Sequence, residues 1–118
     1  MWQHRGMKTP YPDVAIVGAY NTIQAKQLPN WTEPALVLDA IRGALADAGL
    51  TADDVDGVNV STWVSQLGSR TVAQWFGGRP HWTGTSHPGI ECVLEAAAAI
   101  QSGQAHTVVL ATAQCGAY

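Results

Sequence analysis

The sequence has 118 residues, of which 47% are apolar and 13% are charged, and its formal net charge is −3. This length suffices for one hydrophobic core, and the apolar share excludes an intrinsically disordered chain. The six Lys and Arg are dispersed, so nucleic acid is not an expected partner. Charged residues are only about half as frequent as the ~25% usual in soluble domains, which indicates a surface that contacts other protein.

No targeting or membrane-spanning segment is expected in this sequence. Residues 1–12 contain no apolar run, and no later stretch approaches the ~18 uncharged apolar residues that a membrane helix requires. Cys92 and Cys115 lie in or beside apolar segments and match neither a disulfide framework nor a zinc pattern. We therefore expect a cytoplasmic protein without a metal, with an N-terminal extension over 1–12 and a domain over 13–118.

The first half of the chain predicts a strand, a helix and a second strand. Residues 13–19 form a continuous apolar run, typical of a strand that is covered on both faces. Thr32 can cap a helix that has Pro34 in its first turn and ends at Gly49. Four residues of this helix share an apolar face: Leu38, Ile41, Leu45 and Ala48. Residues 55–60 predict the next strand, so the order favours parallel pairing through a right-handed crossover.

The second half predicts a long loop, a buried helix and a further strand. Within the loop, 61–89, Ser69 could cap a short helix. Three tryptophans of this loop could line an apolar pocket but are more often used in core or interface packing: Trp63, Trp75 and Trp82. Residues 90–102 are apolar nearly all round, which is typical of a helix inside a protein. Its polar residues, which we expect to meet water, are Glu91, Glu95 and Gln101. Gly103 ends the helix, and 107–112 form an apolar strand.

Two places in the sequence could bind a ligand or perform chemistry. Gly18 follows the first predicted strand, but Tyr20 and Ile23 stand where a dinucleotide fingerprint requires further glycines, so no nucleotide cofactor is expected. Backbone N–H groups at the start of the buried helix would stabilise an anion or a thiolate. Ser86 there is most simply a loop or capping residue, whereas Ser86 with His87 would form a nucleophile and base if the two side chains converge.

The order and spacing of these elements resemble the N-terminal part of thiolase-superfamily proteins, particularly the sterol-carrier (SCP2) thiolase-like branch. Three segments carry the resemblance: DVAIVGAYNT (13–22), EPALVLDAIRGALADAGLTADDVDGV (33–58) and EAAAAIQSGQAHTVVLATAQ (95–114). The resemblance covers the chain from about Val14 onward. It implies an α/β, thiolase-like layered fold, of which 13–118 would be part of the N-terminal half, with a mainly parallel sheet and a buried Ala-rich helix.

The same resemblance places a candidate residue at the position of the family's nucleophile. In the family, a cysteine opens the buried helix, a glycine follows three residues later, and the glycine that ends the helix follows about seventeen later. Counted back from Gly103, the cysteine position is Ser86, and Gly89 matches the nearer glycine. Cys92 then falls at a mid-helix packing position. The family's catalytic histidine and second cysteine belong to a C-terminal half that this chain does not match, so His87 is not that histidine.

This resemblance implies a lyase of lipid metabolism that acts on a CoA thioester as substrate and holds no bound cofactor. Because Ser86 replaces the cysteine, it favours retro-aldol cleavage of a β-hydroxyacyl-CoA, such as a steroid side chain, which requires no covalent acyl-enzyme. Three alternatives stay open: a non-catalytic acyl-CoA-binding subunit, a thiolytic acyltransferase and a small flavodoxin-like binding domain. The chain would not be catalytically complete alone. The expected partners are the subunits of a homo- or hetero-oligomer, including a small OB-fold protein of the DUF35 type.

Overall fold

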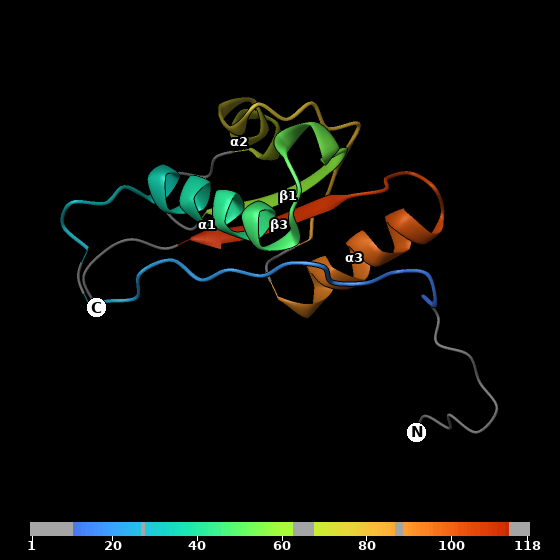
Figure 1. Ribbon diagram of the computed structural model, residues 1–118, viewed down its shortest axis with the longest axis horizontal. Coiled ribbons are helices and arrows are strands. Elements are labelled where there is room, and N and C mark those ends of the chain that lie inside the picture. The colour runs from blue at the N-terminus through green and yellow to red at the C-terminus, as the bar shows by residue number, and fades with distance from the viewer. Residues whose placement is uncertain (1–10, 27, 63–67, 87–88, 114–118) are drawn as a thin grey trace, which may run out of the picture.

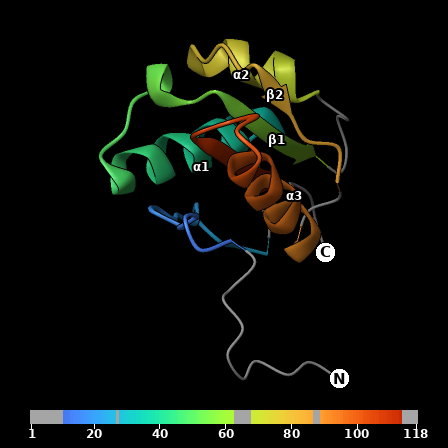
Figure 2. The same cartoon turned by 90° about the vertical axis from the view of Figure 1, so that its right-hand side faces the viewer.

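The computed structural model describes residues 11–26, 28–62, 68–86 and 89–113, which form an α/β unit around a three-stranded parallel sheet (Figure 1). In chain order the elements are α1 (Glu33–Ala48), the 3-10 helix η1 (Ala52–Asp54), β1 (Gly57–Thr62), α2 (Ser69–Phe76), β2 (Trp82–Thr83), α3 (Ile90–Gln101) and β3 (Val108–Ala113). The sheet has the order β2-β1-β3, and both pairs are parallel, which confirms the predicted mainly parallel sheet. The predicted parallel pairing of 13–19 with 55–60 does not form. Helices α1 and α2 lie on one side of the sheet and α3 on the other (Figure 2).

Helix α1 begins and ends where the sequence predicts. The Thr32 hydroxyl accepts a hydrogen bond from the Ala35 N–H at 3.2 Å, which satisfies one of the free donors of the first turn. Gly49 follows the helix with a φ of 71°, a left-handed conformation that glycine adopts without strain. The Leu50 N–H then returns to the Leu45 carbonyl at 2.9 Å, as in a Schellman end.

The hydrophobic core lies between α1, α2 and the side of the sheet that faces them. It consists of nine buried side chains: Val37, Ile41, Leu45, Val55, Val58, Val60, Val72, Ala73 and Val109. Full burial of each valine, leucine or isoleucine contributes about 1.5–3 kcal/mol. Because strand side chains alternate between faces, Asn59 of β1 points away from this core, toward α3.

The predicted strand over 13–19 is wrong, because these residues join no strand in the structure. The segment runs beside α1, outside the sheet (Figures 1 and 2), and Ile16 is 81% exposed. A Cβ on Gly18 would lie 2.6 Å from a carbonyl oxygen of α1, so only glycine allows this close approach. The Ala19 N–H donates to the Asp47 carboxylate at 2.9 Å. These contacts hold the apolar run against α1, whereas a strand needs a paired edge.

The middle segment, 61–89, contains a predicted helix and a strand that was not predicted. The short helix is α2, and it ends at Gly77, whose φ is 88°. Ser69 does not cap it, because Gly68 is the N-cap residue. Instead, the Ser69 hydroxyl accepts the Val60 N–H at 3.0 Å. That hydroxyl provides a partner for β1 beyond the end of the two-residue β2, which pairs only with the first two residues of β1.

Helix α3 is buried on one side rather than all round. Cys92 and three alanines of this helix are buried, while Ile90 is 69% and Leu94 is 50% exposed. Within the described residues one face of α3 is thus buried against the sheet and the other is exposed, because a single layer covers only one face of a helix. Gly103 follows the helix with a φ of 82°, as predicted for its end. No helix in the described part of the chain has the length and apolarity needed to cross a membrane.

Candidate functional site

Ser86 lies in the loop that leads from β2 to α3, and it is half-buried. Its N–H donates to a carboxylate oxygen of Glu95 at 3.2 Å, and its carbonyl accepts from the Asn59 side-chain amide at 3.2 Å. The structure therefore brings residues of β1 and α3 to the predicted position. His87 lies outside the described residues, so its pairing with Ser86 stays a prediction.

The Glu95 carboxylate is the centre of this group of contacts. Three donors converge on its Oε1 atom: the Thr85 N–H at 3.0 Å, the Ser86 N–H at 3.2 Å and the Asn59 Nδ2 at 3.3 Å. We call these three groups the donor cluster. The Thr85 hydroxyl donates to the other oxygen, Oε2, at 3.3 Å. Glu95 was expected to meet water, but it is half-buried and turned toward the loop, because these donors compete with solvent for its charge.

Gly84 gives the donor cluster its shape. A Cβ at this residue would lie 2.4 Å from Glu95 Oε1 and 2.7 Å from Asn59 Nδ2. Both distances are too short for a Cβ contact, so any other residue here would displace these two side chains. The Gly84 N–H donates to the Val58 carbonyl at 2.9 Å, which ties the loop to β1. The glycine thus lets the loop backbone approach the carboxylate closely enough for the next two N–H groups to reach it.

Two opposing effects act on the pKa of Glu95. Burial raises the pKa, but the hydrogen bonds from Ser86 and then from Thr85 lower it, and they outweigh the burial. The net pKa lies below the ordinary value, so the side chain carries a negative charge at neutral pH. A negative charge therefore lies beside Ser86 in this structure.

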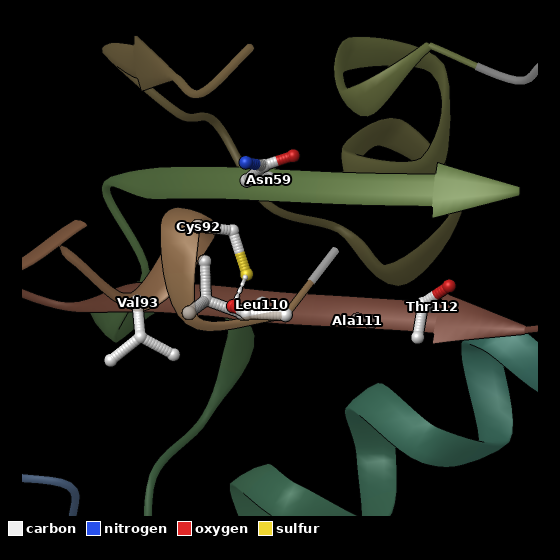
Figure 3. A pocket seen from close by; sticks show the side chains of 7 residues that line it. Asn59, Cys92, Val93, Leu110, Ala111 and Thr112 are labelled. Atoms are coloured by element: carbon white, nitrogen blue, oxygen red, sulfur yellow. Dashed lines mark hydrogen bonds between the residues drawn. The ribbon is translucent and has the colours of Figure 1, made fainter. Parts of the chain in front are cut away.

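An apolar hollow of about 300 Å³ lies between the start of α3 and the strands β1 and β3 (Figure 3). Its lining residues are Asn59, Gly89, Cys92, Val93, Leu110, Ala111 and Thr112. The Cys92 thiol donates to the Gly89 carbonyl at 3.0 Å and is buried. Cys92 thus stands in the first turn of α3, not in the middle of the helix as expected, and its thiol is engaged by the backbone.

A second hollow of about 540 Å³ lies along the other side of α3. Its lining residues are Trp82, Thr83, Thr85, Glu95, Ala98, Ala99, Ser102 and Gln104. The hydrogen bond between Asn59 and Glu95 joins a lining residue of each hollow. Of the three tryptophans singled out in the sequence, Trp82 lines this hollow, Trp75 is 44% exposed, and Trp63 lies outside the described residues.

The sequence reasoning identified Ser86 but missed Asn59 and Glu95. Both are polar residues within apolar segments of the sequence. This pattern indicates that each forms a hydrogen bond, because a buried polar group requires a partner. The sequence alone cannot show that Asn59 and Glu95 bind each other, or that both bind the loop after β2. Within the described residues, no three His, Cys, Asp or Glu side chains lie close enough together to hold a metal ion.

Comparison with known proteins shows a likeness in fold. No family model and no curated protein sequence matches the chain. OleA from Xanthomonas campestris, in a structure with bound lauric acid and lauroyl-CoA, matches at a TM-score of 0.61 and 14% identity over 74% of this chain and 28% of its own. The 3-oxoacyl-[acyl-carrier-protein] synthase III from Aquifex aeolicus VF5 matches at a TM-score of 0.60 and 21% identity, over 74% of this chain and 31% of its own.

The chain therefore has an α/β fold that matches part of the thiolase-like fold of these condensing enzymes. The fold class predicted from the sequence is confirmed. The chain spans less than a third of the length of either of these two proteins, so the match concerns one portion of their architecture.

Proposed function

We propose that this chain provides the first part of a thiolase-like enzyme that makes or breaks a carbon–carbon bond beside an acyl-CoA thioester. The most specific form of the proposal is retro-aldol cleavage of a β-hydroxyacyl-CoA, with a steroid side chain as one possible acyl group. Further subunits, including a small OB-fold protein, would complete the site in a cytoplasmic assembly. The CoA thioester is the substrate, and the chain holds no cofactor of its own.

The observation that carries this proposal is the position of Ser86 between β2 and α3, in a chain whose fold matches part of the thiolase-like fold. The sequence resemblance assigns the family's nucleophile to this position, and the residue there has no thiol. The one described cysteine, Cys92, donates its thiol to the Gly89 carbonyl, as a packed residue does. These features favour a reaction that needs no covalent acyl-enzyme over thiolytic transfer.

Retro-aldol cleavage places clear demands on the site. A base removes the proton of the β-hydroxyl group, the Cα–Cβ bond breaks, and an aldehyde or ketone leaves while the thioester becomes an enolate. The enolate carbon is then protonated to give the shorter acyl-CoA. The Thr85 and Ser86 N–H groups, which donate to Glu95 in this structure, could stabilise the enolate oxygen once that carboxylate moves away. The apolar hollow of about 300 Å³ can hold part of an acyl chain. The base would come from the other subunits.

The test is made on the native assembly that contains this chain, after its mass and its other subunits have been determined by native mass spectrometry. The assembly is incubated with a β-hydroxyacyl-CoA without free CoA, and formation of the aldehyde or ketone and the shorter acyl-CoA is measured. Aldehyde or ketone that forms from the β-hydroxyacyl-CoA without free CoA supports retro-aldol cleavage. Thiolysis requires a β-carbonyl group, so it is tested in a parallel incubation with a β-ketoacyl-CoA and free CoA. Cleavage of the β-keto substrate alone would favour thiolysis. Equal turnover by the Ser86→Ala assembly would remove Ser86 from catalysis.

A second candidate function, a non-catalytic subunit that binds or shapes an acyl-CoA site, is favoured by the charge of Glu95. Its carboxylate occupies the N–H donors beside Ser86. A negative charge at this place opposes the formation of an enolate there. This alternative predicts that Ser86→Ala changes neither the turnover number nor the KM of the assembly.

A further inference from the structure

We propose that the donor cluster is an oxyanion-binding site that Glu95 occupies in the resting chain. When the Glu95 side chain withdraws, a small carboxylate can bind in its place, and so can the enolate oxygen of a thioester. The small-carboxylate ligand follows from the geometry alone. The enolate ligand rests in addition on the proposed function.

The arrangement of the donors is the first argument. Two consecutive backbone N–H groups, of Thr85 and Ser86, reach Glu95 Oε1 at 3.0 and 3.2 Å, and the Asn59 amide reaches it at 3.3 Å. Convergence of fixed N–H groups on one oxygen atom is the geometry by which enzymes stabilise a developing oxyanion. A carboxylate oxygen and an enolate oxygen present the same kind of acceptor to such donors.

The donor cluster also has space for one oxygen atom, and a ligand can reach it from a neighbouring hollow. The missing side chain of Gly84 leaves the space in which Oε1 lies, since a Cβ there would approach that atom to 2.4 Å. Glu95 and Thr85 both line the hollow of about 540 Å³ beside α3. A ligand can therefore reach the donors from this hollow, and the Glu95 side chain can move into it.

The donors keep their places by contacts that do not involve Glu95. The Gly84 N–H is bonded to the Val58 carbonyl at 2.9 Å, and the Ser86 carbonyl is bonded to the Asn59 amide at 3.2 Å. Both contacts tie the loop to β1, so the loop remains beside the strand when the carboxylate is removed. The carboxylate is thus an occupant of the donor cluster rather than the sole support of the loop.

The test uses the full chain with Glu95→Ala and a matched control, Glu91→Ala, which removes an exposed carboxylate one turn earlier on α3. Sodium acetate is the probe, with sodium chloride at equal ionic strength as reference. We expect acetate at ten times its Kd to raise the Tm of the Glu95→Ala chain by about 5 °C, and to shift the Thr85 and Ser86 N–H signals in NMR spectra. The original chain and Glu91→Ala should show neither effect.

A folded Glu95→Ala chain whose Thr85 and Ser86 signals ignore acetate overturns the proposal. If that variant does not fold, Glu95→Gln replaces it, because its side-chain carbonyl can still accept from the donors while the charge is gone. Acetate should then displace the weaker carboxamide and shift the same two signals, and their constancy would again be contrary to the proposal. Acetate binding by these variants leaves open whether the assembly cleaves a β-hydroxyacyl-CoA, so the two proposals fail separately.

Discussion

Single polar residues within apolar elements determine the local geometry of this chain. Asn59 on β1 and Glu95 on α3 contact the same loop, and each would leave a costly unpaired group without the other's element. A second polar junction lies where β1 and β3 begin. There the Asp56 carboxylate accepts N–H groups of His106 and Thr107 at 2.9 Å, and it contacts His106 Nδ1 at 3.0 Å. Both carboxylates tie segments that are distant in sequence.

Asp56→Asn should destabilise the chain at neutral pH but not in acid. Burial raises the pKa of Asp56, but the hydrogen bonds from Thr107 and His106 outweigh it and hold the pKa below 3.8. The stabilisation is therefore present above the unfolded pKa and is lost as pH falls through the folded one. We expect a loss of about 1–2 kcal/mol in the free energy of unfolding at pH 7, measured in urea, and a loss that shrinks as the pH falls through the folded pKa of Asp56. Asp53→Asn, at an exposed residue of η1, is the control.

Gly84→Ala should disrupt the donor cluster, whereas Gly68→Ala should not disturb it. The new methyl group at Gly84 must displace Glu95 and Asn59, while a Cβ on Gly68 meets nothing within 4 Å. We expect the Gly84 variant to lose about 1–3 kcal/mol of stability, since small-to-large changes in tight places force the neighbours to move. The Gly68 variant should lose less than about 1 kcal/mol. Urea unfolding measures both, and equal losses would contradict the close approach at Gly84.

At the scale of elements, the sequence predicted helices better than strands. The helix ends were marked by Thr32, Gly49, Gly77 and Gly103, and local capping chemistry acts at all of these positions. Strand β2 was not predicted because a strand of two residues is too short to show the alternation of apolar and polar side chains. Its pairing also depends on β1, which is distant in sequence. The apolar run 13–19 fits a strand locally, but no local signal shows whether a sheet edge is available to it.

The candidate site was predicted only in part for the same reason. The resemblance to thiolase-superfamily proteins singled out Ser86, through the family's spacing from the nucleophile to the glycine that ends the helix, and this spacing is local in the sequence. The contacts of Glu95 with Thr85 and Asn59 depend on how α3 packs across the sheet. The spacing of apolar residues in the sequence does not show this packing. Residues of a site that come from different elements are therefore found only once the crossover is known.

Two isoleucine variants test the correction at residues 13–19. Ile41 is fully buried in the core, whereas Ile16 is 81% exposed beside α1. Ile41→Ala should cost about 2–5 kcal/mol of stability, and Ile16→Ala should change it by less than about 0.5 kcal/mol. Chemical denaturation of both variants provides the comparison. A large loss for Ile16→Ala would mean that 13–19 is packed as a covered strand after all.

For the whole molecule, the open margin of β3 is the main consequence of the topology. β3 pairs with β1 on one side, and no described strand pairs with its other side. The strand Val108–Ala113 contains no charged residue and no proline, the usual features that protect such an edge from other chains. The exposed Ile90 and Leu94 of α3 add apolar surface. The isolated chain is thus expected to associate.

Self-association of the chain should weaken when β3 receives a charge. Thr112 is exposed on β3, so Thr112→Lys adds a charge to the open margin without removing a core side chain. We expect this variant to remain monomeric at concentrations at which the original chain shows a larger mass by light scattering. Thr71→Lys places the same charge on an exposed residue of α2 and serves as the control. If the original chain, Thr112→Lys and Thr71→Lys associate equally, the association occurs through a surface other than the open edge of β3.

The Ser69 hydroxyl limits where a further strand can pair with the sheet. By binding the Val60 N–H, it satisfies the very group that a longer β2 would need as its next partner. Lengthening on the β2 side would require this bond to break, whereas the outer side of β3 can accept a strand with no prior loss. One hydroxyl group thus closes the part of the β1 edge that lies beyond β2, whereas no described strand occupies the outer side of β3.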